Sequence, residues 1–152
     1  MEIKQEKRGS LIIKGKQSSL TVIDFQIQTE SLTISSPGEY EVGGIQIVGL
    51  AGSEKTNFKI TVDGVKIGLI YGGVSDKQEE IFSNIEVLIL LILDKASQLV
   101  VKLEPKMVVI SGIGDPSVLT RELGKEVKET QRLIIKKESL PQELEVVWLK
   151  SM

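Results

Sequence analysis

Three aspartates, Asp24, Asp76 and Asp115, are the residues of this 152-residue sequence best suited to holding an ion. Carboxylate oxygens are the ligands that Mg²⁺ and Ca²⁺ prefer, so aspartates gathered around one cleft could form such a site. Each aspartate also stands where a turn or a helix start is expected, and there its side chain accepts hydrogen bonds from the backbone. We therefore favour turn and capping roles for all three.

Two further patterns could carry chemistry. The segment Ser111-Gly-Ile-Gly-Asp115 precedes a predicted helix, whose first N–H groups could hold an anion. Asp115 would repel a phosphate, so we interpret the segment as a strand-to-helix turn. Glu39 and Glu41 alternate with Tyr40 and share one face of a strand, where a solvated surface is a better interpretation than an acid/base pair. No spacing selects a Ser–Lys nucleophile.

The sequence contains no histidine and no cysteine. Zinc sites in proteins are built from these two residue types with some carboxylate, so zinc chemistry is not expected. Histidine is also the commonest general base and the partner of serine and cysteine nucleophiles. We therefore expect no metal, no cofactor and no catalytic residue.

Charge and composition exclude further classes of function. The net charge is −2 and only 4% of residues are aromatic, which argues against nucleic-acid binding. The absence of cysteine gives no sign of an oxidising compartment, and the opening Met1-Glu-Ile-Lys4 lacks the pattern of a signal peptide. We expect a cytoplasmic protein without membrane association, folded as one domain over residues 1–152.

The run Ile85–Leu93 is the element around which the other elements must be placed. Eight of its nine residues are apolar, and it is too short to cross a bilayer as a helix. A strand buried on both faces has this composition, whereas a half-exposed strand alternates. A buried helix is the alternative, and Asp94, which could cap a following helix, favours the strand.

The sequence of the first half of the chain predicts antiparallel strands joined by short turns. Gly43-Gly44 and Asp63-Gly64 are two-residue hairpin loops, Lys14-Gly15-Lys16 joins another hairpin, and Pro37-Gly38 is a turn. The predicted strands are Glu2–Arg8, Ser10–Lys14, Ser19–Phe25, Ser31–Ser35, Tyr40–Val42, Ile45–Leu50, Asn57–Val62 and Val65–Ile70.

The second half alternates strands and helices, which predicts parallel pairing with right-handed crossovers. Helices are expected from the capping box Ser75-Asp-Lys-Gln78 to Phe82, over Lys95–Leu103 behind a cap at Asp94, and from Asp115-Pro116 to Gly124. The strands expected after the central run are Met107–Ile110, Leu133–Ile135 and Leu144–Leu149. The fold class is therefore α/β (α+β).

Several segments resemble the metallo-β-lactamase-fold hydrolases, in particular their lactonase-like branch. The most specific is Ser36-Pro-Gly-Glu-Tyr-Glu-Val-Gly-Gly-Ile45 followed by Ile47-Val-Gly49, and Leu103-Glu-Pro-Lys106 is another. Agreement also extends over Leu11–Lys16, Thr21–Asp24, Asn57–Gly68, Asn84–Leu93, Gln98–Ile110 and Leu140–Val147. The resemblance covers most of the chain and implies a β-sandwich covered by helices.

The metal ligands of that family do not carry over. Its His-x-His-x-Asp-His motif falls on Gln26–Ser36, which has no histidine or aspartate, and its bridging aspartate falls on Ile70-Tyr71-Gly72. Its Gly-His-Ser-Cys-Phe corresponds to Lys7–Leu11, and its late histidine to Gly112–Ile113. The resemblance thus implies a degenerate, truncated member with a reduced N-terminal helical layer. The vestigial cleft would be formed by Arg8, Asp24, Tyr71, Gly72, Gly112 and Asp115.

We expect a non-catalytic protein that acts as a self-associating or protein-binding scaffold. The N-terminal strands carry apolar residues at both odd and even positions, and therefore on both faces of their sheet. Without helical cover, one face would expose an apolar patch that a homo-oligomer could bury. Ile12 and Ile23, expected on opposite faces, are the interface candidates. The alternative is a metal-independent hydrolase or a small-ligand-binding protein that reuses the vestigial cleft.

Overall fold

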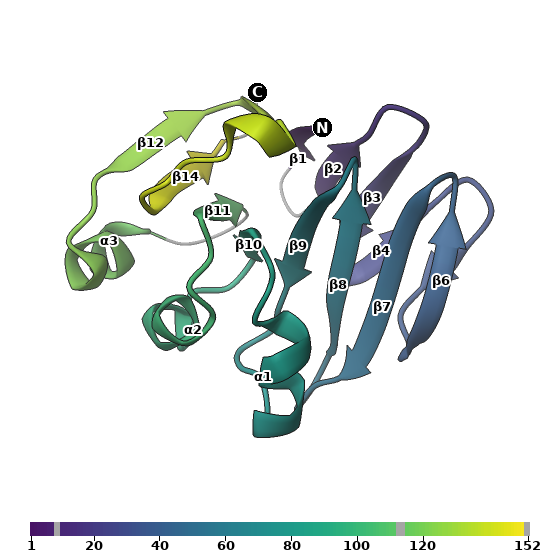
Figure 1. Cartoon of the computed structure of the whole chain (residues 1–152), viewed down its shortest axis with the longest axis horizontal. Coiled ribbons are helices and arrows are strands. Elements are labelled where there is room, and N and C mark those ends of the chain that lie inside the picture. The colour runs from purple at the N-terminus through teal and green to yellow at the C-terminus, as the bar shows by residue number, and fades with distance from the viewer. Residues whose placement is uncertain (8–9, 112–114, 151–152) are drawn as a thin grey trace.

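The structure, a computed structural model, describes residues 1–7, 10–111 and 115–150 as two sheets packed face to face, with helices on one side (Figure 1). The smaller sheet has six antiparallel strands in the order β13-β1-β2-β3-β4-β5. Their bounds are β1 Glu2–Lys7, β2 Ser10–Lys14, β3 Ser19–Ile23, β4 Gln26–Gln28, β5 Thr33–Ile34 and β13 Arg132–Ile134.

The larger sheet has eight strands in the order β12-β14-β11-β10-β9-β8-β7-β6. Strands β6 to β9 pair antiparallel, and β9, β10, β11, β14 and β12 pair parallel, as the two halves of the sequence predict. Their bounds are β6 Gly38–Val42, β7 Ile45–Ala51, β8 Thr56–Val62, β9 Val65–Leu69, β10 Val87–Leu90, β11 Met107–Ser111, β12 Val127–Thr130 and β14 Glu145–Leu149.

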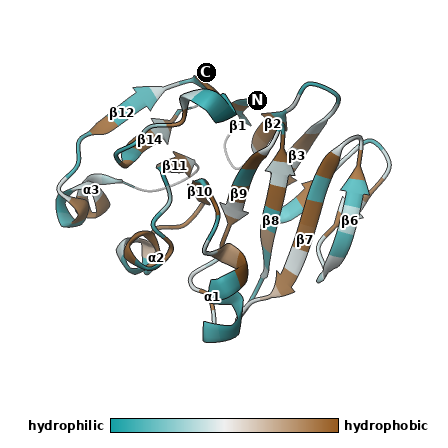
Figure 2. Cartoon of the chain, in the orientation of Figure 1, coloured by the Kyte–Doolittle hydropathy of each residue, from teal (hydrophilic) through white to brown (hydrophobic). Residues whose placement is uncertain are grey.

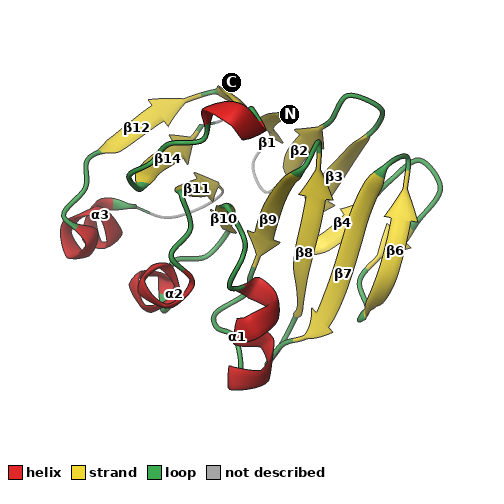
Figure 3. Ribbon diagram, in the orientation of Figure 1, coloured by secondary structure: helices red, strands yellow, loops and turns green. Residues whose placement is uncertain are grey.

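The helices of the described residues all lie along the larger sheet (Figure 3). They are α1 (Asp76–Phe82), α2 (Ala96–Leu103) and α3 (Ser117–Leu123), and a 3₁₀ turn follows at Lys137–Ser139. The apolar residues of the three α-helices pack on the outer face of the larger sheet and form one hydrophobic cluster with it. A second hydrophobic cluster fills the space between the two sheets. In Figure 2, hydrophobic residues, coloured brown, recur along β7, β8 and β9, and Ile47, Ile60 and Ile67 of these strands belong to the cluster between the sheets. No helix in the described part of the chain is long and apolar enough to cross a membrane.

Strand β10 is buried on both faces, as its composition predicts. Val87 and Ile89 pack between the sheets, whereas Leu88 and Leu90 pack under the helices, and all four are at most 1% exposed. The strand ends at Leu90 and not at Leu93, and its last pairing is that of Leu90 with Ile110 of β11. Residues 91–93 instead lead toward α2 and are half-buried.

The glycine-containing hairpin loops and the first helix cap are confirmed. Gly43 and Gly44 have φ of 57° and 83°, and Asp63 and Gly64 have 51° and 79°, the left-handed values that a two-residue hairpin loop requires. The Gln78 N–H donates to Ser75 Oγ at 3.3 Å, which caps α1 as the sequence predicts.

Three further predicted boundaries are wrong. Strand β3 stops at Ile23, because Asp24 and Phe25 adopt φ of 50° and 59° and form a turn into the unpredicted strand β4. Helix α2 begins at Ala96, and its N-cap is Lys95, whose φ is 58°, instead of the predicted Asp94. The predicted strand Ser31–Ser35 is reduced to the two residues of β5, Thr33–Ile34.

The prediction that Ile12 and Ile23 face opposite ways is also wrong. Ile12 pairs with Thr21, and Ile23 is two residues from Thr21, so both isoleucines lie on the outer face of the six-stranded sheet. Leu11, Ile13, Leu20 and Val22 form the buried inner face. Ile12 and Ile23 are each only partly exposed, because Lys4, Thr21 and Gln26 stand beside them in the register.

Candidate functional site

The loops that follow β9 and β10 meet the β3–β4 turn at one edge of the sandwich, which we call the upper edge and which points downward in Figure 1. Tyr71, two residues after β9, packs edge-on against Phe25 with ring centroids 4.8 Å apart and an interplanar angle of 82°. Such an arrangement places a ring edge on the face of its partner and is favourable for aromatic pairs. The structure therefore brings the turn containing Asp24 next to the loop containing Tyr71 and Gly72.

The hydroxyl of Tyr71 is held by a carboxylate. It donates to Glu54 Oε2 at 3.1 Å. This hydrogen bond, together with the negative charges of Glu54 and Asp94, raises the pKa of Tyr71 above 10.0. Because the charged form is disfavoured, the Tyr71 hydroxyl stays protonated at neutral pH and acts as a hydrogen-bond donor to Glu54.

Asn57 fixes the loop that carries Tyr71. Its side chain is fully buried, its Oδ1 accepts from the Tyr71 N–H at 2.9 Å, and its Nδ2 donates to the Gly73 carbonyl at 3.2 Å and to Gln78 Oε1 at 3.4 Å. One amide thereby connects β8, the loop after β9 and helix α1. Sequence reasoning missed this residue, although a polar side chain inside the apolar segment 56–62 was the available signal.

A cavity of about 440 Å³ lies beside this loop. Its lining residues are Ala51, Gly52, Ser53, Gly73, Val74, Ser75, Gln78 and Lys95. The walls are mainly small or polar residues, and Lys95 supplies the one charge among them. Gln78 contributes to the wall by donating from Nε2 to the Ala51 carbonyl. The cavity is within the size range of small-molecule sites.

The three aspartates have separate roles. Asp24 is exposed in its left-handed turn, and Asp76 opens α1 and pairs with Lys102 at 3.8 Å. Asp115 Oδ1 accepts from the Ser117 N–H at 3.0 Å, and this backbone hydrogen bond lowers the pKa of Asp115. Asp115 precedes the capping residue Pro116 and is not itself the N-cap. The turn role of Asp24 is therefore confirmed, whereas the prediction that Asp115 is the N-cap of α3 is wrong, because Pro116 holds that position. Asp115 instead accepts a hydrogen bond in the turn that leads into the helix.

The six residues proposed for the vestigial cleft are only partly brought together. Asp24, Tyr71 and Gly72 lie at the upper edge, and Gly72 has φ of 78°, which suits its turn. No contact in the described part of the chain joins Asp115 to Tyr71. Arg8 and Gly112 lie outside the described residues.

The side chains at the upper edge do not fit zinc. The whole sequence lacks histidine and cysteine, and within residues 1–7, 10–111 and 115–150 no three acidic side chains gather into a metal-binding group. Of the nearby carboxylates, Glu54 already accepts the Tyr71 hydroxyl. Tetrahedral zinc needs three or four nitrogen, sulfur or oxygen ligands from the protein, which this edge does not supply.

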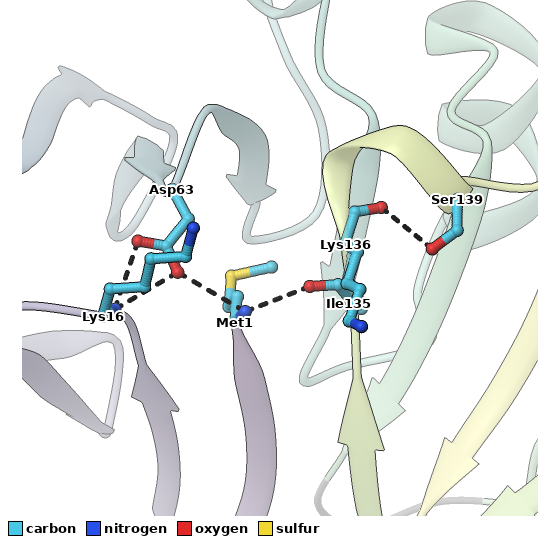
Figure 4. Close-up of polar contacts among 6 residues, drawn as sticks. All are labelled: Met1, Lys16, Asp63, Ile135, Lys136 and Ser139. Carbon is cyan, nitrogen blue, oxygen red and sulfur yellow. Dashed lines mark hydrogen bonds and ion pairs between the residues drawn. The ribbon is translucent and has the colours of Figure 1, made fainter.

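The opposite edge of the sandwich holds a polar centre that joins the two sheets (Figure 4). Asp63 accepts from the Lys16 N–H at 3.2 Å through both oxygens and pairs with the Met1 ammonium at 3.4 Å. The same ammonium donates to the Ile135 carbonyl at 3.0 Å, and nearby Ser139 donates to the Lys136 carbonyl at 3.5 Å. These contacts connect the β2–β3 and β8–β9 turns with β1 and the segment after β13, so we assign this centre to structure.

No known family profile and no curated protein matches the sequence, but solved structures match the fold. A putative Zn-dependent hydrolase of the metallo-β-lactamase superfamily from Thermotoga maritima aligns with a TM-score of 0.76 and 13% identity, over 98% of this chain and 100% of that chain. The metallo-β-lactamase fold protein YhfI from Bacillus subtilis has a TM-score of 0.48 and 13% identity, over 75% of this chain and 50% of its own. A diphosphatase from the PhnP family has a TM-score of 0.46 and 13% identity, over 66% and 47%. The first of these alignments confirms the expected metallo-β-lactamase fold.

Proposed function

We propose that this chain, which has the metallo-β-lactamase fold, is a non-catalytic protein that acts by association and that its first partner is a second copy of itself. The observation that carries the proposal is the unequal cover of the two sheets. All described helices pack on the eight-stranded sheet, and none of them crosses the outer face of the six-stranded sheet.

The chemistry of the upper edge supports a non-catalytic role. In metal-dependent hydrolases the nucleophile is a metal-bound water, and the residues here do not fit zinc. The raised pKa of Tyr71 keeps its phenol protonated, so that no phenolate is available as a base, and Glu54 already accepts the hydrogen bond of that phenol. The residues that the fold places at this edge therefore hold each other in position.

Purified, untagged protein is expected to carry no stoichiometric zinc or iron after dialysis, as measured by elemental analysis. It should also fail to hydrolyse lactone, β-lactam and phosphodiester substrates with added Mn²⁺ or Zn²⁺, because no set of nitrogen and sulfur ligands exists to hold the metal. The assay control is Asp24→Asn and Asp115→Asn protein. Turnover that co-purifies with the protein and is lost in either variant would overturn this proposal.

The outer face of the six-stranded sheet has the composition of a modest interface. Ile12 and Ile23 stand at its centre as diagonal neighbours, and Ile134 on the edge strand β13 is 53% exposed. The remaining positions are mostly polar, with both signs of charge on Lys4 and Glu2. The apolar patch is thus smaller than the sequence suggests. A two-fold arrangement would allow one such patch to serve both subunits.

Sedimentation equilibrium at high micromolar concentration is expected to show a reversible dimer. Ile12→Lys with Ile23→Lys should raise the dissociation constant at least about tenfold, because the charges would be buried at the centre of the contact. The control is Val101→Lys with Val118→Lys, which adds the same charge on the helices. These two side chains are 70% and 57% exposed, so this variant should leave assembly unchanged. A wild type that stays monomeric throughout would contradict the self-association.

The cavity beside Tyr71 supports a second candidate, a small-ligand-binding protein. Its volume fits a metabolite, and Lys95 would attract a carboxylate or phosphate group. A panel of small organic acids and phosphates should raise the thermal midpoint of the wild type but not of Lys95→Gln. Partly exposed Lys125→Gln, on the segment after α3, is the matched control. No shift with any member of the panel would remove this candidate.

A further inference from the structure

Strand β6 is a free edge of the eight-stranded sheet. The strand order ends at β6, whose described partner is β7 alone, and Figure 1 shows it at the outer end of the sheet. A free edge presents unpaired backbone N–H and C=O groups to which another extended segment can bond.

The pairing register shows which backbone groups of β6 are available. Gly43 and Gly44 form a two-residue loop, so the flanking pair Val42 and Ile45 exchanges hydrogen bonds. Hydrogen-bonded and non-bonded pairs then alternate, which makes Glu39 and Glu41 the non-bonded positions, opposite Val48 and Gln46. The N–H and C=O groups of Glu39 and Glu41 therefore point away from β7.

The side chains of these two residues give the edge a negative charge. Glu39 and Glu41 are both exposed and share the outer face, and within the described residues neither forms an ion pair. A surface depression of about 370 Å³ lies beside them, lined by Glu39, Tyr40, Glu41, Gln46, Ile47 and Val48.

The inner side of the same edge is apolar. Tyr40 is half-buried against the core between the sheets, and its hydroxyl donates to the Ser36 carbonyl at 3.1 Å. Successive residues of an added strand point alternately to the two faces of a sheet. Every second residue of such a strand would therefore lie beside the glutamates, and the others would lie beside Tyr40.

We propose that β6 binds an extended segment of another protein, in which lysine or arginine alternates with apolar residues, by adding it as a ninth strand. The basic residues pair with Glu39 and Glu41 across the new strand pair, and the apolar residues extend the core beside Tyr40. A second copy of this chain does not fit, because two β6 edges would place glutamates opposite one another. The site is on the other sheet from the proposed dimer contact, so the two proposals are independent.

The probe is a fluorescein-labelled decapeptide of alternating lysine and valine, titrated with the full-length protein by fluorescence anisotropy. Glu39→Lys with Glu41→Lys should weaken binding at least tenfold. Glu122→Lys with Glu143→Lys changes the net charge equally at exposed positions away from β6 and should have no effect. A peptide of five lysines followed by five valines should bind at least tenfold more weakly than the alternating one.

Two measurements separate strand addition from charge attraction alone. Glu41→Pro removes an outward N–H without removing a bond to β7, and it should weaken binding more than Glu41→Gln, which loses the same charge but keeps the N–H. Urea unfolding confirms that both variants are folded. In hydrogen exchange, the amides of Glu39 and Glu41 should gain protection when the alternating peptide is present. The proposal would be overturned if the two double lysine variants lost binding equally. Binding without this gain in protection, or no binding at all, would also overturn it.

Discussion

Leu90→Ala is expected to lower the free energy of unfolding by about 2–5 kcal/mol, the range measured for buried leucines in other proteins. Leu90 is 1% exposed and lies at the end of β10, beneath the helices. Truncation removes apolar contacts from a strand paired on both sides by β9 and β11, where neighbouring strands restrict collapse into the cavity.

Equilibrium urea unfolding measures this loss, and Val101→Ala is the control. Val101 is 70% exposed on α2, so the same type of truncation should change the free energy of unfolding by about 0.5 kcal/mol or less. A loss below about 1 kcal/mol for Leu90→Ala would contradict the central position of β10 between the two apolar clusters.

The elements that could be predicted from sequence are those whose local signals agree with their tertiary surroundings. Asp63-Gly64 predicts its hairpin because both residues tolerate positive φ, and Ser75 predicts its helix because a hydroxyl there can accept the Gln78 N–H. The continuous apolar composition of β10 predicts burial on both faces, since nothing along it could remain in water.

The failures occur where tertiary contacts override local preference. A turn at Asp24-Phe25 places an aromatic residue at positive φ, a rare choice that Phe25 can adopt while its ring packs against Tyr71. Strand β12 consists of Val127, Lys128, Glu129 and Thr130, which carries little apolar signal and is a strand because β14 pairs with it. Neither the register nor the partner strand is visible in the local sequence.

The surroundings of Tyr71 were only partly accessible to sequence reasoning. The resemblance grouped Asp24, Tyr71 and Gly72 in one cleft, and the structure packs Phe25, the neighbour of Asp24, against Tyr71. Glu54 and Asn57 were missed, because their roles depend on hydrogen bonds to Tyr71, which is 17 and 14 residues away in the sequence. A sequence shows that two residues can form such a bond, but only the fold shows that they meet.

Glu86→Ala is expected to cost about 1–3 kcal/mol of unfolding free energy at pH 7, because it leaves a backbone donor without its acceptor. Glu86 is 9% exposed and lies just before β10. Its Oε1 accepts from the Lys66 N–H at 3.0 Å, and its Oε2 accepts from Lys137 Nζ. The side chain thus joins the start of β10 to β9 and to the segment after β13.

The carboxylate form of Glu86 is the one that makes these contacts. Burial alone would raise its pKa, but the hydrogen bonds from Lys137 and Lys66 and the positive charges of Lys137 and Lys106 outweigh burial. The pKa in the folded protein is therefore below the ordinary value of 4.5. A group with a lowered folded pKa contributes its stability above the unfolded pKa and loses it as the pH falls through the folded value.

The stability advantage of the wild type over Glu86→Gln should accordingly be constant above about pH 6 and should shrink as the pH falls below 4.5. Glutamine keeps an acceptor for the Lys66 N–H but cannot ionise, so the comparison isolates the charge of Glu86. Urea unfolding from pH 3 to 7 measures it, and Glu122→Gln, at an exposed helical position, is the control for general acid effects. Lys137→Met should reduce the pH-dependent part of the difference, because it removes the principal cation facing Glu86. An advantage that stays constant or grows toward pH 3 would mean that the carboxylate is not the stabilising form, and that Glu86 contributes through neutral hydrogen bonding alone.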